Sequence, residues 1–257
     1  MKTIVIANQK GGVGKTTTVL CIAGILQARG KKVLVIDTDV QCNCSDVYRA
    51  KIKDTCTLYD VLLSKEPCTI EEAIQHTEAG DIIAADPLLK EADAALSNTA
   101  SAYFRLQEAL KDLKGYDYVL IDTNPIINTM LYNALVASDS VIIPITASRF
   151  ATTGLAQLIN SIEEIRKYMN PKLSIDGLLL VRFNERTNLN KDTKVVFTNL
   201  SKQVGVKLFK TYIREATKCG EAQTLRVPLI SYAPKCTTEE DYEAFVQEWI
   251  GGRKRNG

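Results

Sequence analysis

The sequence predicts an α/β fold made of a single domain, with a mostly parallel twisted sheet and helices on both faces. Apolar runs of strand length recur along the 257 residues, and most are unbroken Val/Ile/Leu runs. Such runs are typical of strands that are covered on both faces. Helix-like stretches separate several of them, which favours parallel strands joined by helices. Since no repeat, low-complexity tract or Pro/Gly-rich linker divides the chain, we expect one domain over residues 1–257.

The expected elements can be placed in order along the chain. The expected strands are residues 3–7, 32–37, 81–85, 116–122, 139–145, 175–183 and 206–213. The expected helices are residues 16–29, 100–113, 153–168 and 190–204, with a last one over 237–250. Residues 42–75 show no clear period, and we expect a surface excursion there rather than core. We expect residues 251–257 to form a flexible basic tail.

Composition excludes several classes of protein. A charged fraction of 24% and a hydrophobic fraction of 46% are ordinary for a globular domain. Without an apolar stretch of membrane-spanning length or a signal peptide, the chain is expected to be cytoplasmic. The seven cysteines are scattered and the chain has one histidine, so we expect reduced thiols and no zinc site. The net charge of +2 means that any nucleic-acid binding must come from a local patch.

A glycine-rich stretch, N-Q-K-G-G-V-G-K-T-T at residues 8–17, follows the first expected strand and opens the first expected helix. Compared with the common phosphate loop G-x-x-x-x-G-K-[ST], it has Gln9 at the first glycine position and a second lysine, Lys10. Backbone N–H groups and the helix dipole of such a turn hold an anion, and glycines let the backbone approach it. We therefore expect Lys15 to reach the β- and γ-phosphates of a nucleotide and Thr16 to bind Mg²⁺.

Carboxylates follow two of the expected strands. Asp37 and Asp39 end V-L-V-I-D-T-D, and Asp122 ends Y-V-L-I-D. Ligands of open α/β sheets bind at the carboxyl ends of the strands. An aspartate at such a place can cap a helix or form a turn, but beside a phosphate loop we expect it to face a cation, because desolvating an unpaired carboxylate is costly.

Three motifs together resemble the deviant Walker A ATPases of the ParA/MinD family: K-G-G-V-G-K-T-T, the D-x-D pair, and Y-D-Y-V-L-I-D-T-x-P. The resemblance is strongest to the short, Soj-like ParA partition ATPases, and it covers nearly the whole chain. It implies a P-loop NTPase fold, ATP and Mg²⁺ as cofactors, and slow ATP hydrolysis stimulated by a partner. The chain departs from the family at D-V-Q-C-N (39–43, usually D-P-Q-G-N), at Asn124, usually proline, and at Ile213-Arg214, usually I-P-R.

The resemblance also implies a role for each residue of the site. Lys10 would cross to a partner subunit and contact its nucleotide, so that an ATP-bound homodimer completes both active sites, as an arginine finger in trans does elsewhere. Asp39 would position the attacking water, Asp37 would lie near the water shell of Mg²⁺, and Asp122 would hold Mg²⁺ through water. Thr17 would contact the α-phosphate. The catalytic residues are then Lys10, Lys15 and Asp39, the metal-binding residues Thr16, Asp37 and Asp122, and the ATP-binding residues Lys10, Gly11, Gly12, Val13, Gly14, Lys15, Thr16 and Thr17.

Family members of this kind bind double-stranded DNA without sequence preference once ATP has made them dimers. The matching basic positions here are Arg186, Arg214 and Lys218, and several lysines surround them in the sequence. A phosphate-contacting patch predicts a steep loss of DNA affinity with salt. The resemblance thus implies a cytoplasmic ATPase, associated with the nucleoid when ATP is bound, that segregates a plasmid, chromosome or mobile element with a ParB-like adaptor protein.

Two other functions stay open at this point. A MinD-like membrane-cycling ATPase would need a C-terminal amphipathic helix with a basic polar face. The expected helix over 237–250 has an acidic polar face instead, which anionic lipid repels, so we expect it to dock on its own domain and expect no membrane partner. The altered D-V-Q-C-N segment also allows a slow-hydrolysing, ATP-gated interaction switch.

Overall fold

The computed structural model describes residues 1–96, 99, 101–147 and 151–253. Within these residues the strands form one seven-stranded sheet in the order β3-β4-β2-β5-β1-β6-β7, in which the β3–β4 pair is antiparallel and the other pairs are parallel. The strands are β1 (Lys2–Ile6), β2 (Val33–Asp37), β3 (Ile74–Thr77), β4 (Gly80–Ile83), β5 (Tyr118–Asp122), β6 (Ser140–Ile145) and β7 (Ser174–Leu180). The expectation of a mostly parallel α/β sheet is confirmed.

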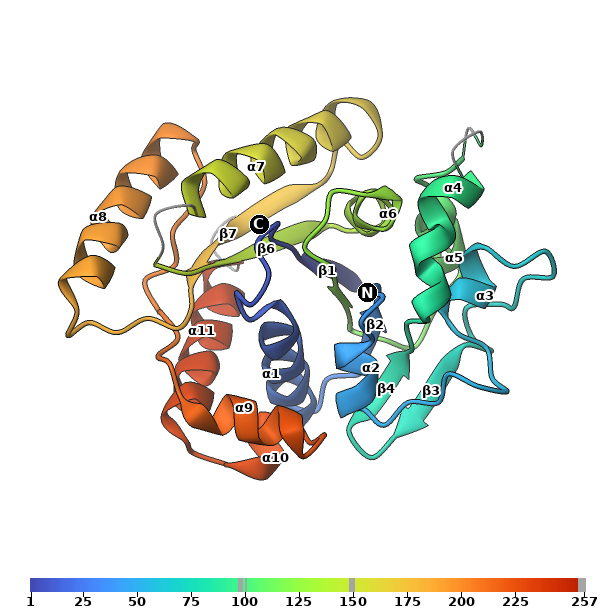
Figure 1. Ribbon diagram of the computed structural model, residues 1–257, viewed down its shortest axis with the longest axis horizontal. Helices are drawn as coiled ribbons and strands as arrows, with labels where there is room; N and C mark the ends of the chain where they lie inside the picture. Colours follow the sequence, from blue (N-terminus) through green and yellow to red (C-terminus); the bar gives the residue numbers. More distant parts are fainter. Residues whose placement is uncertain (97–98, 100, 148–150, 254–257) are drawn as a thin grey trace.

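Helices cover both faces of the sheet, with α1 and α11 on one face and α6 and α7 on the other (Figure 1). The helices are α1 (Lys15–Ala28), α2 (Asn43–Val47), α3 (Leu58–Leu62), the 3-10 helix η1 (Pro87–Glu91), α4 (Ala92–Leu96), α5 (Arg105–Leu110), α6 (Thr129–Val136), α7 (Ala151–Tyr168), α8 (Asn188–Gln203), α9 (Thr217–Thr224), α10 (Leu229–Tyr232) and α11 (Thr237–Arg253).

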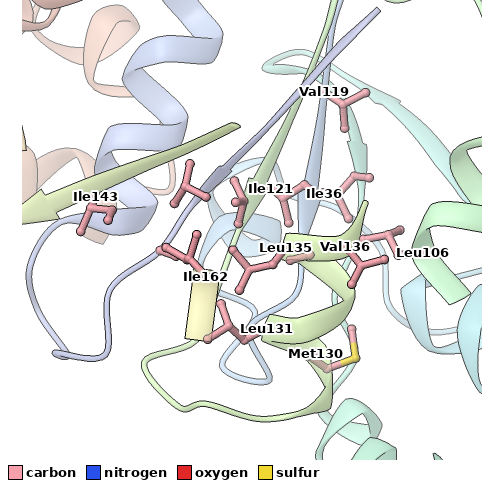
Figure 2. Packing of buried hydrophobic residues seen from close by; sticks show 14 of the residues in the cluster. Ile36, Leu106, Val119, Ile121, Met130, Leu131, Leu135, Val136, Ile143 and Ile162 are labelled. Carbon is pink, nitrogen blue, oxygen red and sulfur yellow. The ribbon is translucent and has the colours of Figure 1, made fainter. Parts of the chain in front are cut away.

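The strands contribute side chains to two hydrophobic cores, one on each face of the sheet. Successive residues of a strand point to opposite faces, so Ile4 and Ile6 of β1 join the core under α1 and α11, whereas Val5 joins the other. In the second core, Val119 and Ile121 of β5 pack near residues of α6, as Figure 2 shows. Burial on both faces explains why these strands are continuous apolar runs.

The segment 206–213 does not form the strand that the sequence predicts. It lies beside β7 and exchanges single backbone hydrogen bonds with it, such as Leu178 N to the Lys207 carbonyl at 2.7 Å. The N–H groups of Lys210 and Thr211 donate instead to the Glu248 carboxylate of α11, at 3.0 and 2.9 Å. Because the Glu248 carboxylate takes these two donors, the pairing with β7 is interrupted there, and it resumes where Ile213 N donates to the Leu180 carbonyl at 2.8 Å.

The segment 42–75 is also different from the expectation of a surface excursion. It contributes α2, α3 and the start of the edge strand β3, and the side chains of Leu58, Leu62 and Ile70 are buried in the core. The helix α3 begins with a capping box in which Thr57 and Asp60 hydrogen-bond each other. The expectation of reduced thiols throughout is wrong for one pair, because Cys56 and Cys68 are joined by a disulfide across α3.

The C-terminal helix α11 packs on its own domain, as the sequence predicts. Tyr242, Phe245 and Trp249 are buried, and the Tyr242 hydroxyl shares a 2.8 Å hydrogen bond with Thr18 of α1. The helix continues to Arg253, so the first residues of the expected flexible tail are helical, while residues 254–257 lie outside the described part. In the part of the chain that the structure describes, none of the helices combines the length and the hydropathy needed to cross a bilayer.

Candidate nucleotide-binding site

The candidate site lies where β1, β2 and β5 end next to one another. Parallel pairing aligns Ile6 of β1 with Asp122 of β5, and Asp122 with Asp37 of β2. The glycine-rich loop leaves β1 at the same edge and leads directly into α1. The sequence motifs, which are spread over residues 8–122 of the chain, are therefore brought together by the register of the sheet.

The glycine-rich loop has backbone conformations that require glycine. Gly12 and Gly14 have φ angles of 69° and 74°, in the left-handed region that residues with a Cβ rarely adopt. Gly14 is also the N-cap of α1, and it has no side chain with which to bind the first N–H groups of the helix. Those N–H groups and the positive end of the helix dipole are what a phosphate group would need.

Lys15 supplies a positive charge inside this loop. Its side chain is largely buried, and its Nζ lies 3.4 Å from the Lys10 carbonyl oxygen. Burial lowers the pKa of the Lys15 ammonium, while the nearby carboxylates of Asp122 and Asp39 act to raise it. A polyphosphate placed in the loop would stabilise the charged form of this lysine.

Asp122 has the environment expected of a carboxylate that faces a cation. The Thr16 hydroxyl donates to its Oδ2 at 2.6 Å, whereas its Oδ1 is buried without a hydrogen-bond partner among the described residues. Burial raises the pKa of Asp122 well above its ordinary value, and the neighbouring Asp37 raises it further. An unpartnered buried oxygen beside a threonine hydroxyl is suited to Mg²⁺ or one of its waters, because Mg²⁺ is usually held by one or two carboxylates together with substrate phosphates.

Asp37 and Asp39 have different surroundings although only one residue separates them. Asp37 is fully buried and accepts hydrogen bonds from the backbone N–H of Asp39 at 3.0 Å and from both the N–H and the hydroxyl of Ser45, at 2.8 and 2.7 Å. Burial raises the pKa of Asp37 to about 6, against these hydrogen bonds, which favour its charged form. Asp37 therefore fixes the backbone of Asp39, and its predicted place near the Mg²⁺ waters stays a prediction.

Asp39 itself faces the nucleotide cavity. Its Oδ1 accepts the backbone N–H of Gln41 at 3.0 Å, and the residue lines a cavity of about 700 Å³ together with Lys15 and Thr16. A carboxylate held in this way next to the phosphate loop can orient a water molecule.

Lys10 lies at the rim of the loop. Its backbone N–H donates to Asn8 Oδ1 at 2.9 Å, and its Nζ lies 3.5 Å from the Thr146 hydroxyl, just beyond the end of β6. In this single chain the ammonium thus rests against its own subunit, and its crossing to a second copy stays a prediction.

The cavity extends from the phosphate loop to residues that the sequence analysis did not select. Arg182, Glu215 and Gln223 line it, and Gln223 Nε2 donates to the Thr17 hydroxyl at 3.1 Å. Arg182 could have been noticed, since it is a charged residue directly after a buried strand, in the same kind of position as Asp39. The other two carry no local signal, because their segment joins the site only through the tertiary fold.

The basic residues predicted to contact DNA are only partly available. Arg214 forms a bridge to Asp241 of α11, with Nη2 to Oδ1 at 2.6 Å, and Lys218 pairs with Glu221 at 2.8 Å. Arg186 is exposed in the loop that leads to α8, and Lys191 and Lys202 are exposed on that helix. The isolated bridge between Phe183 and Arg214 brings the start of the Arg186 loop beside the 213–218 segment.

Comparison with known proteins connects this geometry to one group. Residues 1–175 match the family described as AAA domain. The chain is 35% identical over 255 residues to the chromosome partitioning protein ParA of Caulobacter vibrioides, covering 97% of this chain and 94% of that protein. It is 36% identical over 253 residues to the sporulation initiation inhibitor protein Soj of Bacillus subtilis, covering 96% of this chain and 97% of that protein.

The fold is also similar to that of a solved structure. Cobyrinic acid a,c-diamide synthase from Mycobacterium smegmatis, with a bound ATP analog and magnesium, matches with a TM-score of 0.85 and 26% identity, covering 99% of this chain and 97% of that chain. This chain therefore shares its fold with a protein that has been solved with an ATP analog and magnesium.

Proposed function

The chain belongs to the family of ParA and Soj partition ATPases, and from this premise we propose that it hydrolyses ATP slowly to segregate a plasmid, chromosome or mobile element. It dimerises on ATP, binds double-stranded DNA without sequence preference, and is stimulated by a ParB-like adaptor protein. The observation that carries this proposal is the buried Oδ1 of Asp122, which has no hydrogen-bond partner among the described residues and lies in a carboxyl bound to Thr16, at the end of a loop that contains two lysines.

The residues of the site account for slow phosphoryl transfer. The loop N–H groups and Lys15 would hold the phosphates, and Asp39 would orient the attacking water. Thr16 and Asp122 would hold Mg²⁺, which would supply neutralisation of the charge on the phosphate oxygens. Placement and charge neutralisation supply most of the catalysis in such reactions. A carboxylate is a weak base at neutral pH, so hydrolysis is slow until a partner improves the geometry.

Dimerisation supplies one more positive charge to each active site, the ammonium of Lys10 from the other copy. Lys10 lies at the rim of its own loop, with its ammonium near Thr146. Movement of this side chain to the nucleotide of a second copy would add a cation to each active site and make ATP the link that holds the dimer together.

DNA binding is expected from the exposed basic residues around α8. Arg186, Lys191 and Lys202 are exposed. Arg214 and Lys218 are engaged with acidic residues in the single chain, so their contribution to DNA binding would require these pairs to open. Membrane cycling is not proposed, because the apolar side of α11 is buried against its own domain.

A DNA mobility assay with ATP, ADP and no nucleotide, at two salt concentrations, tests the proposal. We expect retardation of unrelated DNA sequences only with ATP and a steep loss at the higher salt. Asp39→Ala should hold the protein in its ATP-bound, DNA-binding state, because water is no longer positioned for hydrolysis. DNA binding that does not depend on nucleotide would contradict the proposal, and so would ATP turnover unchanged in Asp39→Ala.

A further inference from the structure

Arg182 lies at the carboxyl end of β7, on the same edge of the sheet as the phosphate loop. Its neighbours are fixed by backbone hydrogen bonds, since Val181 N donates to the Ile145 carbonyl at 2.8 Å and Phe183 N donates to the Ile213 carbonyl at 2.9 Å. Arg182 itself has a φ angle of 53°, in the left-handed region. This conformation is unfavourable for a residue with a Cβ, and such strain is concentrated at ligand-binding sites.

The guanidinium of Arg182 joins the phosphate loop to the opposite wall of the cavity. Its Nε and Nη2 both donate to Oε1 of Glu215, at 2.9 and 2.6 Å, and its Nη1 donates to the Gly12 carbonyl at 3.3 Å. Arg182 and Glu215 both line the cavity that contains Lys15, Thr16 and Thr17. The guanidinium is thus already in contact with the loop that would surround a polyphosphate.

The partner that Arg182 has in this structure is a weak one. The two side chains are 58% and 56% exposed, and an exposed ion pair contributes little to stability because water screens it. A nucleotide polyphosphate carries more negative charge than one carboxylate, and its oxygens accept the same two-pronged hydrogen bonds from a guanidinium. A polyphosphate in the loop can therefore replace Glu215 as the hydrogen-bond partner of the Arg182 guanidinium.

We propose that Arg182 is a nucleotide-binding residue whose guanidinium is held by Glu215 in the empty site and moves to the phosphate chain when ATP or ADP binds. Glu215 then acts as an internal competitor that lowers the affinity for nucleotide. This inference rests on the nucleotide-binding part of the proposed function and is independent of DNA binding. It adds a third cation to the site, from a part of the chain outside the phosphate loop.

The test is a titration of the full chain with Mg²⁺ and a fluorescent ADP or ATP analogue, comparing three variants. Arg182→Gln should weaken binding about tenfold, the loss expected for a charge-assisted hydrogen bond. Glu215→Gln should strengthen binding about two- to fivefold, because the competing ion pair is gone. In the double variant, Arg182→Gln with Glu215→Gln, the gain in nucleotide affinity should disappear, since no guanidinium remains to be released from Glu215.

Matched controls separate this inference from simpler explanations. Glu163 and Arg166 form a similarly exposed pair on α7, and Glu163→Gln should leave the nucleotide affinity unchanged. Weaker binding in both Arg182→Gln and Glu215→Gln would show a purely structural bridge and overturn the proposal. A gain from Glu215→Gln that persists in the Arg182→Gln background would show simple repulsion and also overturn it. Unchanged affinity in Arg182→Gln, with a loss of dimerisation alone, would place the arginine at a second copy instead.

Failure of the proposed function gives a different result. If the wild-type chain bound neither nucleotide, the ATP site itself would be wrong. If the wild type bound nucleotide but all three variants matched it, only the role of Arg182 would be overturned. Thermal unfolding without nucleotide checks that each variant is folded, and we expect all of them to unfold near the wild-type temperature because the pair is exposed.

Discussion

The Thr16 hydroxyl donates to Asp122 Oδ2 at 2.6 Å and thereby joins the first turn of α1 to the end of β5, while Oδ1 of the same carboxyl is buried without a partner among the described residues. Burial raises the pKa of Asp122 well above its ordinary value in the empty site. A nearby cation favours the charged form and lowers a carboxyl pKa. We therefore expect binding of Mg²⁺ and nucleotide to release a proton from this site, and the affinity to rise with pH.

Titration calorimetry in two buffers of different ionisation enthalpy measures the released proton. Asp122→Asn should lose both the proton release and most of the Mg²⁺-dependent part of the affinity. The control is Asp112→Asn, because Asp112 is exposed in the turn before β5. Equal binding heats in the two buffers for the wild-type protein would contradict this role of Asp122.

The buried carboxyl of Asp37 should make the stability of the nucleotide-free protein depend on pH. Its pKa is about 6 in the folded chain, compared with a usual value of 3.8, because the carboxyl is buried. A raised pKa means that the folded state binds the proton more tightly than the unfolded state does. The stabilisation is complete below pH 3.8 and is lost as the pH rises to about 6, by on the order of 3 kcal/mol.

Urea unfolding at a series of pH values without nucleotide measures the slope of the free energy of unfolding against pH. Asp37→Asn should make this slope shallower, even if the variant is less stable because the hydrogen bonds of Ser45 to the carboxyl change. Asp54→Asn, in an exposed turn, should keep the wild-type slope. A slope that is the same in Asp37→Asn and in the wild type would show that Asp37 does not titrate in this window.

The Cys56–Cys68 disulfide makes the stability sensitive to reductant. The two residues are 12 positions apart, and closing a loop of this length stabilises a protein by about 3 kcal/mol in the chain-entropy model. We expect reduction to lower the free energy of unfolding by a similar amount, and the Cys56→Ser/Cys68→Ser variant to be indifferent to reductant. Denaturant curves with and without reductant check this.

Lys10 is expected to separate nucleotide binding from dimer formation. Lys10→Ala removes the charge near Thr146 but leaves Lys15 and the loop N–H groups, so nucleotide should still bind. The ATP-dependent dimer should be lost, because the cation that each subunit lends to its partner is missing. Sedimentation with a non-hydrolysable ATP analogue measures the outcome, and a normal dimer would exclude the crossing of Lys10. Lys15→Ala is the matched control, which should lose nucleotide binding itself.

Much of the fold and the phosphate end of the site could be predicted from the sequence because their signals are local. The doubly covered strands are continuous apolar runs, and the loop motif indicates by its own spacing which residues would surround a phosphate. The strand β3 (I-Q-H-T) is too polar and too short to give such a signal. The capping box of Thr57 and Asp60 was readable as a helix start, whereas the exchange of partners by segment 206–213 depends on Glu248, far along the chain. The contact between Arg182 and the Gly12 carbonyl likewise exists only once β7 and β1 lie in one sheet.

Arg186 is the most direct test of the DNA surface, because it is exposed while Arg214 and Lys218 have acidic partners in the chain. Arg186→Glu should weaken ATP-dependent binding to all unrelated DNA sequences alike, since a phosphate contact carries no sequence information. It should also make the salt dependence shallower, because fewer counterions are released. Mobility assays at several salt concentrations measure both effects, with Arg166→Glu on α7 as the control. If Arg186→Glu bound DNA as the wild type does, or if Arg166→Glu weakened binding equally, the surface around α8 would not be the DNA-contacting one.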